Sequence, residues 1–218
     1  MGKYEPVHQL DPFPEKGYDI MNITKNYYQE YSQEFFDSTV MADVTPLYDH
    51  FLKYVPENGI ILDLGCGSGR DTKAFLDKGY LVDAIDGSEE LCALAGKYAG
   101  VDVKCMDFES IDFTDRYDAI WACASLLHVR SDKLPSLLER LLNALHADGV
   151  MYMSFKYGDF EGERDGRFFL DMTEDKFHML LSGVDGSELV EEWTSRDVRR
   201  GKEVDWYNAI VREKPSED

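Results

Sequence analysis

The chain has 218 residues, with 43 aspartates and glutamates against 23 lysines and arginines, so its formal net charge is −20. This charge repels nucleic-acid phosphates and anionic membrane surfaces, and we expect neither as a general partner. A content of 44% hydrophobic and 13% aromatic residues indicates a globular chain, and the length fits one domain. Small or cationic substrates remain compatible with these features.

The compartment is inferred from signals that the sequence lacks. No segment approaches the roughly 20 apolar residues of a transmembrane helix, and the N-terminal residues contain no apolar core of signal-peptide length. None of the four cysteines forms a Cys-x-x-Cys pair. We therefore predict a cytoplasmic protein, without a metal site, whose thiols are reduced and mostly buried: Cys66, Cys92, Cys105 and Cys123.

The first 55 residues are expected to precede the main fold. Residues 1–19, rich in proline and charge, predict an irregular leader. Aromatic residues recur at helical spacing across 22–38, and the helix expected there has one face formed by Tyr27, Tyr31 and Phe35. A second helix is expected from Thr45, an N-cap residue followed by proline, to about Tyr54.

From residue 60 onward, strands and helices alternate. Apolar segments predict strands at 60–64, 80–85, 101–105, 117–122 and 150–155. Helices are expected between them at 70–78, 88–100 and 134–146, with Gly79 closing the first and Ser88 capping the second. This alternation predicts right-handed crossovers and a parallel sheet that carries helices on both faces.

The C-terminal part departs from that alternation. A helix is expected over 173–181 with Thr173 as its N-cap, followed by strand-like segments at 188–193 and 204–212. Their short connection predicts an antiparallel hairpin. The tip of this hairpin is expected to be a solvated turn that carries three arginines, Arg196, Arg199 and Arg200.

The segment ILDLGCGSGRD, at 61–71, carries the strongest functional signal. Gly65, Gly67 and Gly69 separate an apolar strand from a helix, so the backbone can approach a ligand closely at the helix N-terminus. Asp86 ends the following strand 21 residues after Gly65, where a carboxylate can accept hydrogen bonds from both hydroxyls of a ribose. Together these features predict an adenosine-containing ligand at the carboxyl edge of the sheet.

With this motif the sequence resembles the class I S-adenosyl-L-methionine (SAM)-dependent methyltransferases. The resemblance implies a Rossmann-like α/β fold whose seven-stranded sheet has the order 3-2-1-4-5-7-6, with strand 7 antiparallel, and an N-terminal helical lid. It covers residues 20–213 as a single domain, in which 20–55 form the helical cap, and leaves 214–218 as a tail. The stretches GCGSGRD, AIDGS, ACASLLHV, SFKYG and DGRFF resemble a small-molecule subgroup often labelled tellurite-resistance-like.

The resemblance implies that SAM is the methyl donor and S-adenosyl-L-homocysteine (SAH) the product. The glycine loop would hold the methionine moiety, and the Arg70 guanidinium could pair with its carboxylate. Asp107 would accept a hydrogen bond from the adenine amino group. The residues expected to contact SAM are Tyr27, Tyr31, Asp63, Gly65, Cys66, Gly67, Arg70, Asp86, Gly87, Ser88, Met106, Asp107, Phe108, Ala122, Cys123 and Ala124.

The acceptor is expected to bind beside His128, the candidate catalytic residue, because an imidazole can orient or deprotonate a nucleophile. Residues 154–169 are expected to form a long loop. Its basic residues, Arg164 included, would make a positive area suited to an anionic acceptor. The residues expected to contact the acceptor are Leu127, His128, Lys156, Tyr157 and Arg167.

The functional hypothesis is methyl transfer from SAM to a small molecule by in-line displacement, in which the protein acts mainly by positioning its substrates. One alternative is a SAM-binding regulatory module without catalysis. Another is an NAD-dependent oxidoreductase, but its fingerprint needs a glycine where this chain has Arg70. Nucleic-acid methylation is disfavoured by the charge. Neither the acceptor nor the oligomeric state follows from the sequence.

Overall fold

The computed structural model describes residues 20–199, 201 and 203–214. The predicted leader over 1–19, Arg200 and residues 215–218 of the predicted tail lie outside the described residues. Within the described part of the chain, no helix has both the length and the apolar character needed to cross a membrane.

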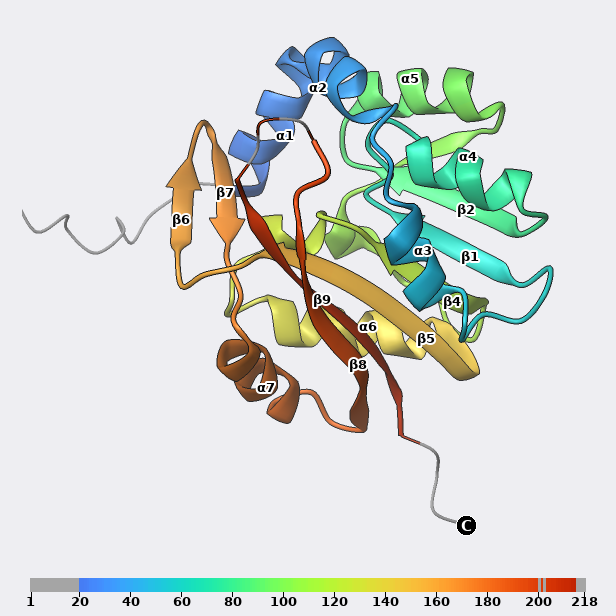
Figure 1. The fold of residues 1–218 in the computed structure, drawn as a ribbon, viewed down its shortest axis with the longest axis vertical. Coiled ribbons are helices and arrows are strands. Elements are labelled where there is room, and N and C mark those ends of the chain that lie inside the picture. Colours follow the sequence, from blue (N-terminus) through green and yellow to red (C-terminus); the bar gives the residue numbers. More distant parts are fainter. Residues whose placement is uncertain (1–19, 200, 202, 215–218) are drawn as a thin grey trace, which may run out of the picture.

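A seven-stranded mixed sheet forms the centre of the molecule (Figure 1). Its strands lie in the order β3-β2-β1-β4-β5-β9-β8; the first five are parallel, and β9 runs antiparallel between β5 and β8. Their bounds are β1 (Ile60–Leu64), β2 (Leu81–Asp86), β3 (Val103–Cys105), β4 (Tyr117–Ala122), β5 (Leu145–Lys156), β8 (Ser187–Arg196) and β9 (Asp205–Glu213). The expected seven-stranded sheet with a terminal antiparallel hairpin is therefore observed.

Helices cover both faces of the sheet, as predicted. Alternation along β4 shows this directly: Trp121 packs against Phe51 and Phe75 on one face, while Ile120 belongs to the core that contains Leu138 on the other. The helices are α1 (Ile20–Glu30), α2 (Ser32–Thr39), α3 (Thr45–Phe51), α4 (Arg70–Asp77), α5 (Glu89–Ala99), α6 (Leu134–Asn143) and α7 (Glu174–Ser182), with short 3₁₀ turns η1 (Phe108–Ser110) and η2 (Leu126–His128).

Two of the three predicted N-caps are confirmed: Ser88 and Thr173 accept hydrogen bonds from the backbone N–H groups of Leu91 and Lys176. The third was wrong, because Thr45 is the first residue of α3 and Val44 occupies the N-cap position. The single helix expected over 22–38 is instead two helices that break at Tyr31, whose backbone is not helical. The helix expected to reach residue 146 ends at Asn143 and the next strand begins at Leu145, since a buried leucine fits either element.

The prediction of a long loop over 154–169 was wrong. Strand β5 continues to Lys156, and the following residues form a separate hairpin of β6 (Glu161–Arg164) and β7 (Arg167–Leu170). Asp165 and Gly166 make its turn with positive φ values of 54° and 72°. An Asp-Gly pair is the residue choice that such two-residue turns require. This signal was present in the sequence, and the hairpin it makes lies beside α1 (Figure 1).

A buried carboxylate joins the helical layer to the sheet. Asp71, at the start of α4, accepts hydrogen bonds from Tyr48 Oη at 2.6 Å and Trp121 Nε1 at 2.8 Å. Its neighbour Arg70 donates from Nε at 2.6 Å and from Nη2 at 2.9 Å. These bonds fix α3, α4 and β4 to one another, and Arg70 together with the two hydrogen-bonding donors keeps the pKa of Asp71 below its usual value despite burial.

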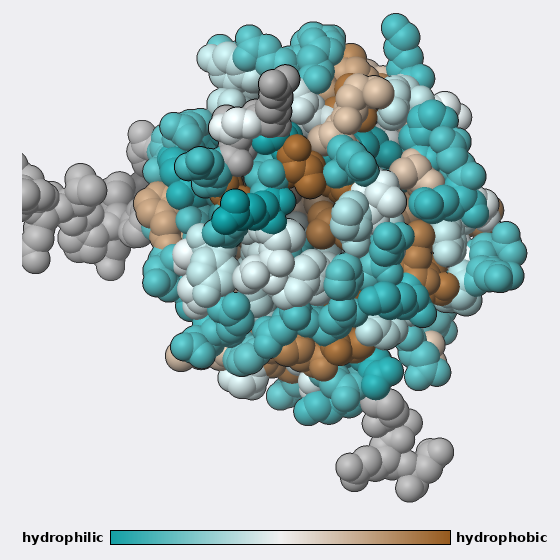
Figure 2. Space-filling model, viewed as in Figure 1, coloured by the Kyte–Doolittle hydropathy of each residue, from teal (hydrophilic) through white to brown (hydrophobic). Residues whose placement is uncertain are grey.

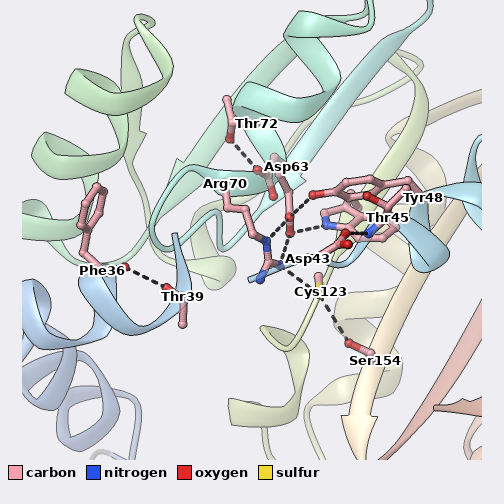
Figure 3. Close-up of polar contacts among 12 residues, drawn as sticks. Phe36, Thr39, Asp43, Thr45, Tyr48, Asp63, Arg70, Thr72, Cys123 and Ser154 are labelled. Atoms are coloured by element: carbon pink, nitrogen blue, oxygen red, sulfur yellow. Dashed lines mark hydrogen bonds and ion pairs between the residues drawn. The ribbon is translucent and has the colours of Figure 1, made fainter. Parts of the chain in front are cut away.

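A second buried carboxyl group, that of Asp63, lies nearby and has a different hydrogen-bonding partner. Asp63 accepts a hydrogen bond from Thr72 Oγ1 at 2.5 Å, the polar partner that a carboxyl inside an apolar strand needs (Figure 3). Burial, together with the charge of Asp71, raises the pKa of Asp63. The neutral acid is therefore favoured at Asp63, whereas the anion is favoured at Asp71.

The same substitution is expected to cost much more stability at Asp71 than at Asp63. Asp71→Asn should lower the free energy of unfolding by about 3 kcal/mol or more, because it leaves the Arg70 guanidinium buried without a counter-charge. Asp63→Asn should cost below about 1.5 kcal/mol, since an amide oxygen can still accept from Thr72. Urea unfolding of both variants tests this, and an equal loss in the two would contradict the assignment of charges.

Candidate functional site

One cavity of about 550 Å³ opens at the carboxyl ends of the parallel strands. Its walls come from the loops after β1, β2 and β4, from α1 and α2, and from residues at the tip of the β8–β9 hairpin. The volume lies within the roughly 300–1,000 Å³ of small-molecule sites. On the face drawn in Figure 2, hydrophilic residues cover most of the surface and hydrophobic residues show only in separate patches between them.

The glycine loop forms the floor of this cavity. Gly65 and Gly67 have φ values of 75° and 55°, which strongly favour glycine. A Cβ on Gly65 would lie 2.6 Å from Ser125 Cβ, and a Cβ on Gly67 would lie 2.9 Å from Phe35 Cε1. Side chains at these two positions would therefore collide with the walls, and bare backbone faces the cavity.

Asp86 lies beside this loop, as expected. Its Oδ2 accepts from the Gly67 N–H and its Oδ1 from the Ser88 N–H, both at 2.9 Å. Burial raises the pKa of Asp86, and the backbone N–H donors act in the opposite direction. Each oxygen keeps a further lone pair, and Asp86, Gly87 and Ser88 all line the cavity.

Apolar and charged residues meet in the part of the cavity formed by the residues that follow β3. Met106 and Phe108 line the cavity together with Asp107, so the three residues predicted there are brought together. The Asp107 carboxylate is paired with Lys25 Nζ at 2.9 Å. Lys25 comes from α1 and was missed, because an exposed-looking lysine on a helix gives no sequence signal for a contact 82 residues away.

The N-terminal helices contribute residues other than those predicted. Neither Tyr27 nor Tyr31 lines the cavity, and Tyr31 is 39% exposed. Tyr27 instead stacks with Arg167, whose Cζ lies 4.3 Å from the ring centroid. The helix face that lines the cavity carries Thr24, Lys25, Tyr28 and, beyond the break, Phe35.

Of three further residues predicted to contact SAM, one lines the cavity and two do not. Arg70 lines the cavity, but its Nε and Nη2 already donate to Asp71. Asp63 and Ala122 are buried outside the cavity lining. In Figure 3 a dashed line joins Arg70 to Cys123, and Asp63 is turned toward Thr72. The sequence indicated that Asp63 needed a partner but could not indicate which one.

The loop after β4 brings small residues to the middle of the cavity. Cys123, Ala124 and Leu127 line it, and the Ala124 N–H donates to Ser154 Oγ at 2.9 Å. Burial raises the pKa of the Cys123 thiol to about 12, so this cysteine is held as a thiol and not as a nucleophilic thiolate. Among the described residues, no cluster of histidine, cysteine or acidic side chains could hold a metal ion.

His128 is held in one tautomer by its two neighbours. The Phe168 carbonyl can only accept, so His128 Nδ1 donates to it at 2.6 Å. Nε2 then accepts from Tyr28 Oη at 2.9 Å. Burial lowers the pKa of His128 to about 4. The imidazole is therefore neutral at pH 7, and both of its nitrogens are already bonded.

Of the residues predicted on the acceptor side, four line the cavity along with Phe169: Leu127, His128, Lys156 and Arg167. Tyr157 does not: it is 42% exposed and donates to Glu174 at 2.8 Å. Arg164 is paired with Asp171 at 2.9 Å and lies outside the lining.

The tip of the β8–β9 hairpin also differs from the sequence prediction. It is not a purely solvated turn, since Asp197 and Arg199 line the cavity and pair with each other at 2.6 Å. Trp206 and Asn208 from β9 line it as well. The arginine-rich turn gave no sequence signal for this contact, because its position depends on how the hairpin packs against the rest of the sheet.

Comparisons with known proteins agree with this geometry. Residues 61–149 match the family model described as a methyltransferase domain. A protein of Staphylococcus carnosus described as an uncharacterized methyltransferase is 28% identical over 172 residues, which cover 72% of this chain and 81% of that protein. A putative methyltransferase of Bacillus subtilis, YqeM, is 27% identical over 157 residues, 65% of this chain and 62% of that protein.

The fold is similar to a solved structure, the 1,6-didemethyltoxoflavin-N1-methyltransferase of Burkholderia thailandensis. The TM-score is 0.74 at 21% sequence identity, over 94% of each chain. The matching segment, with its glycine loop and adjoining strands, is similar to a methyltransferase domain. Together these similarities support a SAM-dependent methyltransferase activity for the chain.

The environment of His128 predicts that its ring stays neutral at pH values well below the ordinary pKa of histidine. In a ¹⁵N NMR titration, the His128 ring signals should keep the Nδ1–H pattern from pH 8 to 5, because its pKa is lowered to about 4. The ring signals of His50, His146 and His178, which are partly exposed, are recorded in the same spectra for comparison. A His128 midpoint near 6.5 would contradict this assignment.

Proposed function

We propose that the cavity binds SAM along the glycine loop and a small-molecule methyl acceptor in the half lined by His128, Lys156 and Arg167. The observation that carries this proposal is that Gly65, Gly67 and Asp86 line one cavity together with Asp107 and Phe108. The fit is supported by two features: the bare glycine backbone and Ser125 Oγ, a buried hydroxyl without a hydrogen-bond partner among the described residues.

In the donor half, each carboxylate oxygen of Asp86 would accept from one ribose hydroxyl with its remaining lone pair. The adenine would pack against Met106 and Phe108. Asp107 would accept from the adenine amino group, which requires it to share its carboxylate with Lys25. The backbone of Gly65, Cys66, Gly67, Gly87 and Ser88 would form the surface that these moieties contact.

Arg70 would pair with the methionine carboxylate. Its Nη1 has no hydrogen bond to another described residue, while Nε and Nη2 are fixed by Asp71. This arrangement holds the guanidinium at a set position in the cavity wall. Binding a second carboxylate there would complete the fork without moving the arginine.

The N-terminal helices would act as the lid. Helix α1 contacts α5 and β7, and the Phe168 N–H donates to Thr24 Oγ1 at 3.0 Å. We propose residues 20–213 as one domain in which 20–55 cover the cavity, and we retain the resemblance to the tellurite-resistance-like subgroup as a proposal. A small-molecule acceptor is supported by the Burkholderia structure, which holds its own acceptor and SAH.

SAM supplies a methyl group on a positively charged sulfur, so the protein's contribution is alignment and exclusion of water. Cys123 and Ala124 leave room for close approach of donor and acceptor in the middle of the cavity. Tyr28 Oη donates to His128 Nε2, and this bond fixes the phenol against the cavity wall. With His128 neutral and bonded, the chain acts by positioning and not through a free imidazole base.

Calorimetric titration with SAM tests the donor half. Wild type should bind below the millimolar range, and Asp86→Asn should weaken binding about 10- to 100-fold, since hydrogen bonds to a charged group contribute roughly 1.5–3 kcal/mol. Asp102→Asn, an exposed carboxylate outside the cavity lining, is the matched control and should bind as wild type does. No SAM binding by wild type, or equal affinities of wild type and Asp86→Asn, would refute the proposal.

A further inference from the structure

Two cations in the acceptor half lack counter-charges. Lys156 Nζ lies 3.8 Å from the centroid of the Phe169 ring, and Arg167 Cζ lies 5.1 Å from the same centroid. Among the described residues, the Lys156 side chain has no hydrogen bond or ion pair, and the acidic residue that acts on it, Asp171, is already paired with Arg164. The Arg167 side chain donates only to Tyr28 Oη, at 3.5 Å, within the same part of the chain. Arg167 Nε is buried without any partner in this part of the chain.

The other arginines of the cavity region are neutralised. Arg70 pairs with Asp71, Arg164 with Asp171 and Arg199 with Asp197. The highly exposed Arg196 lies 3.8 Å from Asp205. Lys156 and Arg167 therefore contribute two uncompensated positive charges inside a protein whose net charge is −20. Like charges brought together away from water repel each other, so the free site is electrostatically unfavourable until an anion enters.

The residues around the two cations indicate what kind of molecule would carry the anion. The rings of Phe169, Tyr28 and Trp206 line the same part of the cavity. A planar or apolar body could pack against them. A guanidinium with a free N–H beside an ammonium is suited to the two oxygens of a carboxylate.

This group is separate from the arginine assigned to the donor. Arg70 follows the glycine loop at the start of α4. Lys156 ends β5, and Arg167 begins β7 in the β6–β7 hairpin. Figure 1 shows that hairpin beside α1, on the opposite side of the drawing from β1 and β2. The cavity thus offers Arg70 to the carboxylate of the donor. It offers Lys156 and Arg167 to a carboxylate on the acceptor.

We propose that Lys156 and Arg167 bind a carboxylate on the methyl acceptor, whose body packs against Phe169. The inference rests on the proposed function and narrows it to one substrate class, aromatic or otherwise apolar acids. Lys156 and Arg167 are binding residues in this assignment and take no part in the transfer of the methyl group.

Benzoate and its neutral isostere benzamide test the charge requirement. With the donor half filled by excess SAH, calorimetry should show benzoate binding in the millimolar range or tighter, at least 10-fold stronger than benzamide. Lys156→Met and Arg167→Met should each weaken benzoate about 10-fold or more and leave SAH affinity unchanged. Lys97→Met, on the surface of α5, should leave both affinities unchanged.

The pH dependence provides an independent readout with a charge-preserving variant. Burial and the facing charges of Arg164, Arg167 and Arg199, opposed by Asp171, lower the pKa of Lys156 to about 8. A bound anion favours the protonated amine, so benzoate affinity should be constant below pH 8 and fall above it. Lys156→Arg should bind benzoate with no such fall, because arginine stays protonated. His128, with a pKa lowered to about 4, does not titrate in this range.

The outcomes separate this inference from the proposed function. Equal binding of benzoate and benzamide, or no benzoate binding, would overturn the inference while SAH binding upheld the donor site. A parallel loss of SAH affinity in Lys156→Met and Arg167→Met would assign the cations to the donor and also overturn it. Failure of wild type to bind SAH would instead refute the proposed function.

Discussion

The buried charge of Asp71 is the interaction on which the rest of the site depends. It receives hydrogen bonds from α3, from β4 and from its neighbour Arg70, and so fixes the start of α4 directly after the glycine loop. A loop with three residues at positive φ has little freedom once both of its ends are held. The floor of the cavity is therefore set by a polar network behind it, and Arg70 is presented at its edge by the same network.

Charge is distributed unevenly around this floor. The protein carries −20 overall, and its buried carboxylates near the cavity are each neutralised differently: Asp71 by an arginine, Asp86 by backbone N–H groups, and Asp63 by a raised pKa that favours the neutral acid. The part of the cavity beside the glycine loop thereby carries a carboxylate suited to hydroxyl groups, and the part beside β7 carries two cations whose side chains have no ion pair among the described residues. The negative field of the whole chain opposes an anionic acceptor, and Lys156 and Arg167 offset it locally.

Most of the sheet and the glycine loop could be predicted from sequence because they depend on local patterns. Apolar runs, the spacing of Gly65, Gly67 and Asp86, and the Ser88 cap are each readable within a few residues. Contacts between distant segments were not readable: Lys25 with Asp107, Tyr28 with His128, and Arg199 in the cavity wall depend on packing. The β6–β7 hairpin is an intermediate case, since Asp165-Gly166 marked its turn but its strands are only four residues each.

We propose that one cavity holds a donor on the glycine loop and an acceptor on the far wall. A crystal structure of the protein with SAH and benzoate would show both ligands at once. We expect the ribose hydroxyls within hydrogen-bonding distance of Asp86, the adenine against Phe108, and the benzoate carboxylate between Lys156 and Arg167. SAH bound away from the glycine loop, or with its own carboxylate on Lys156 and Arg167, would contradict it.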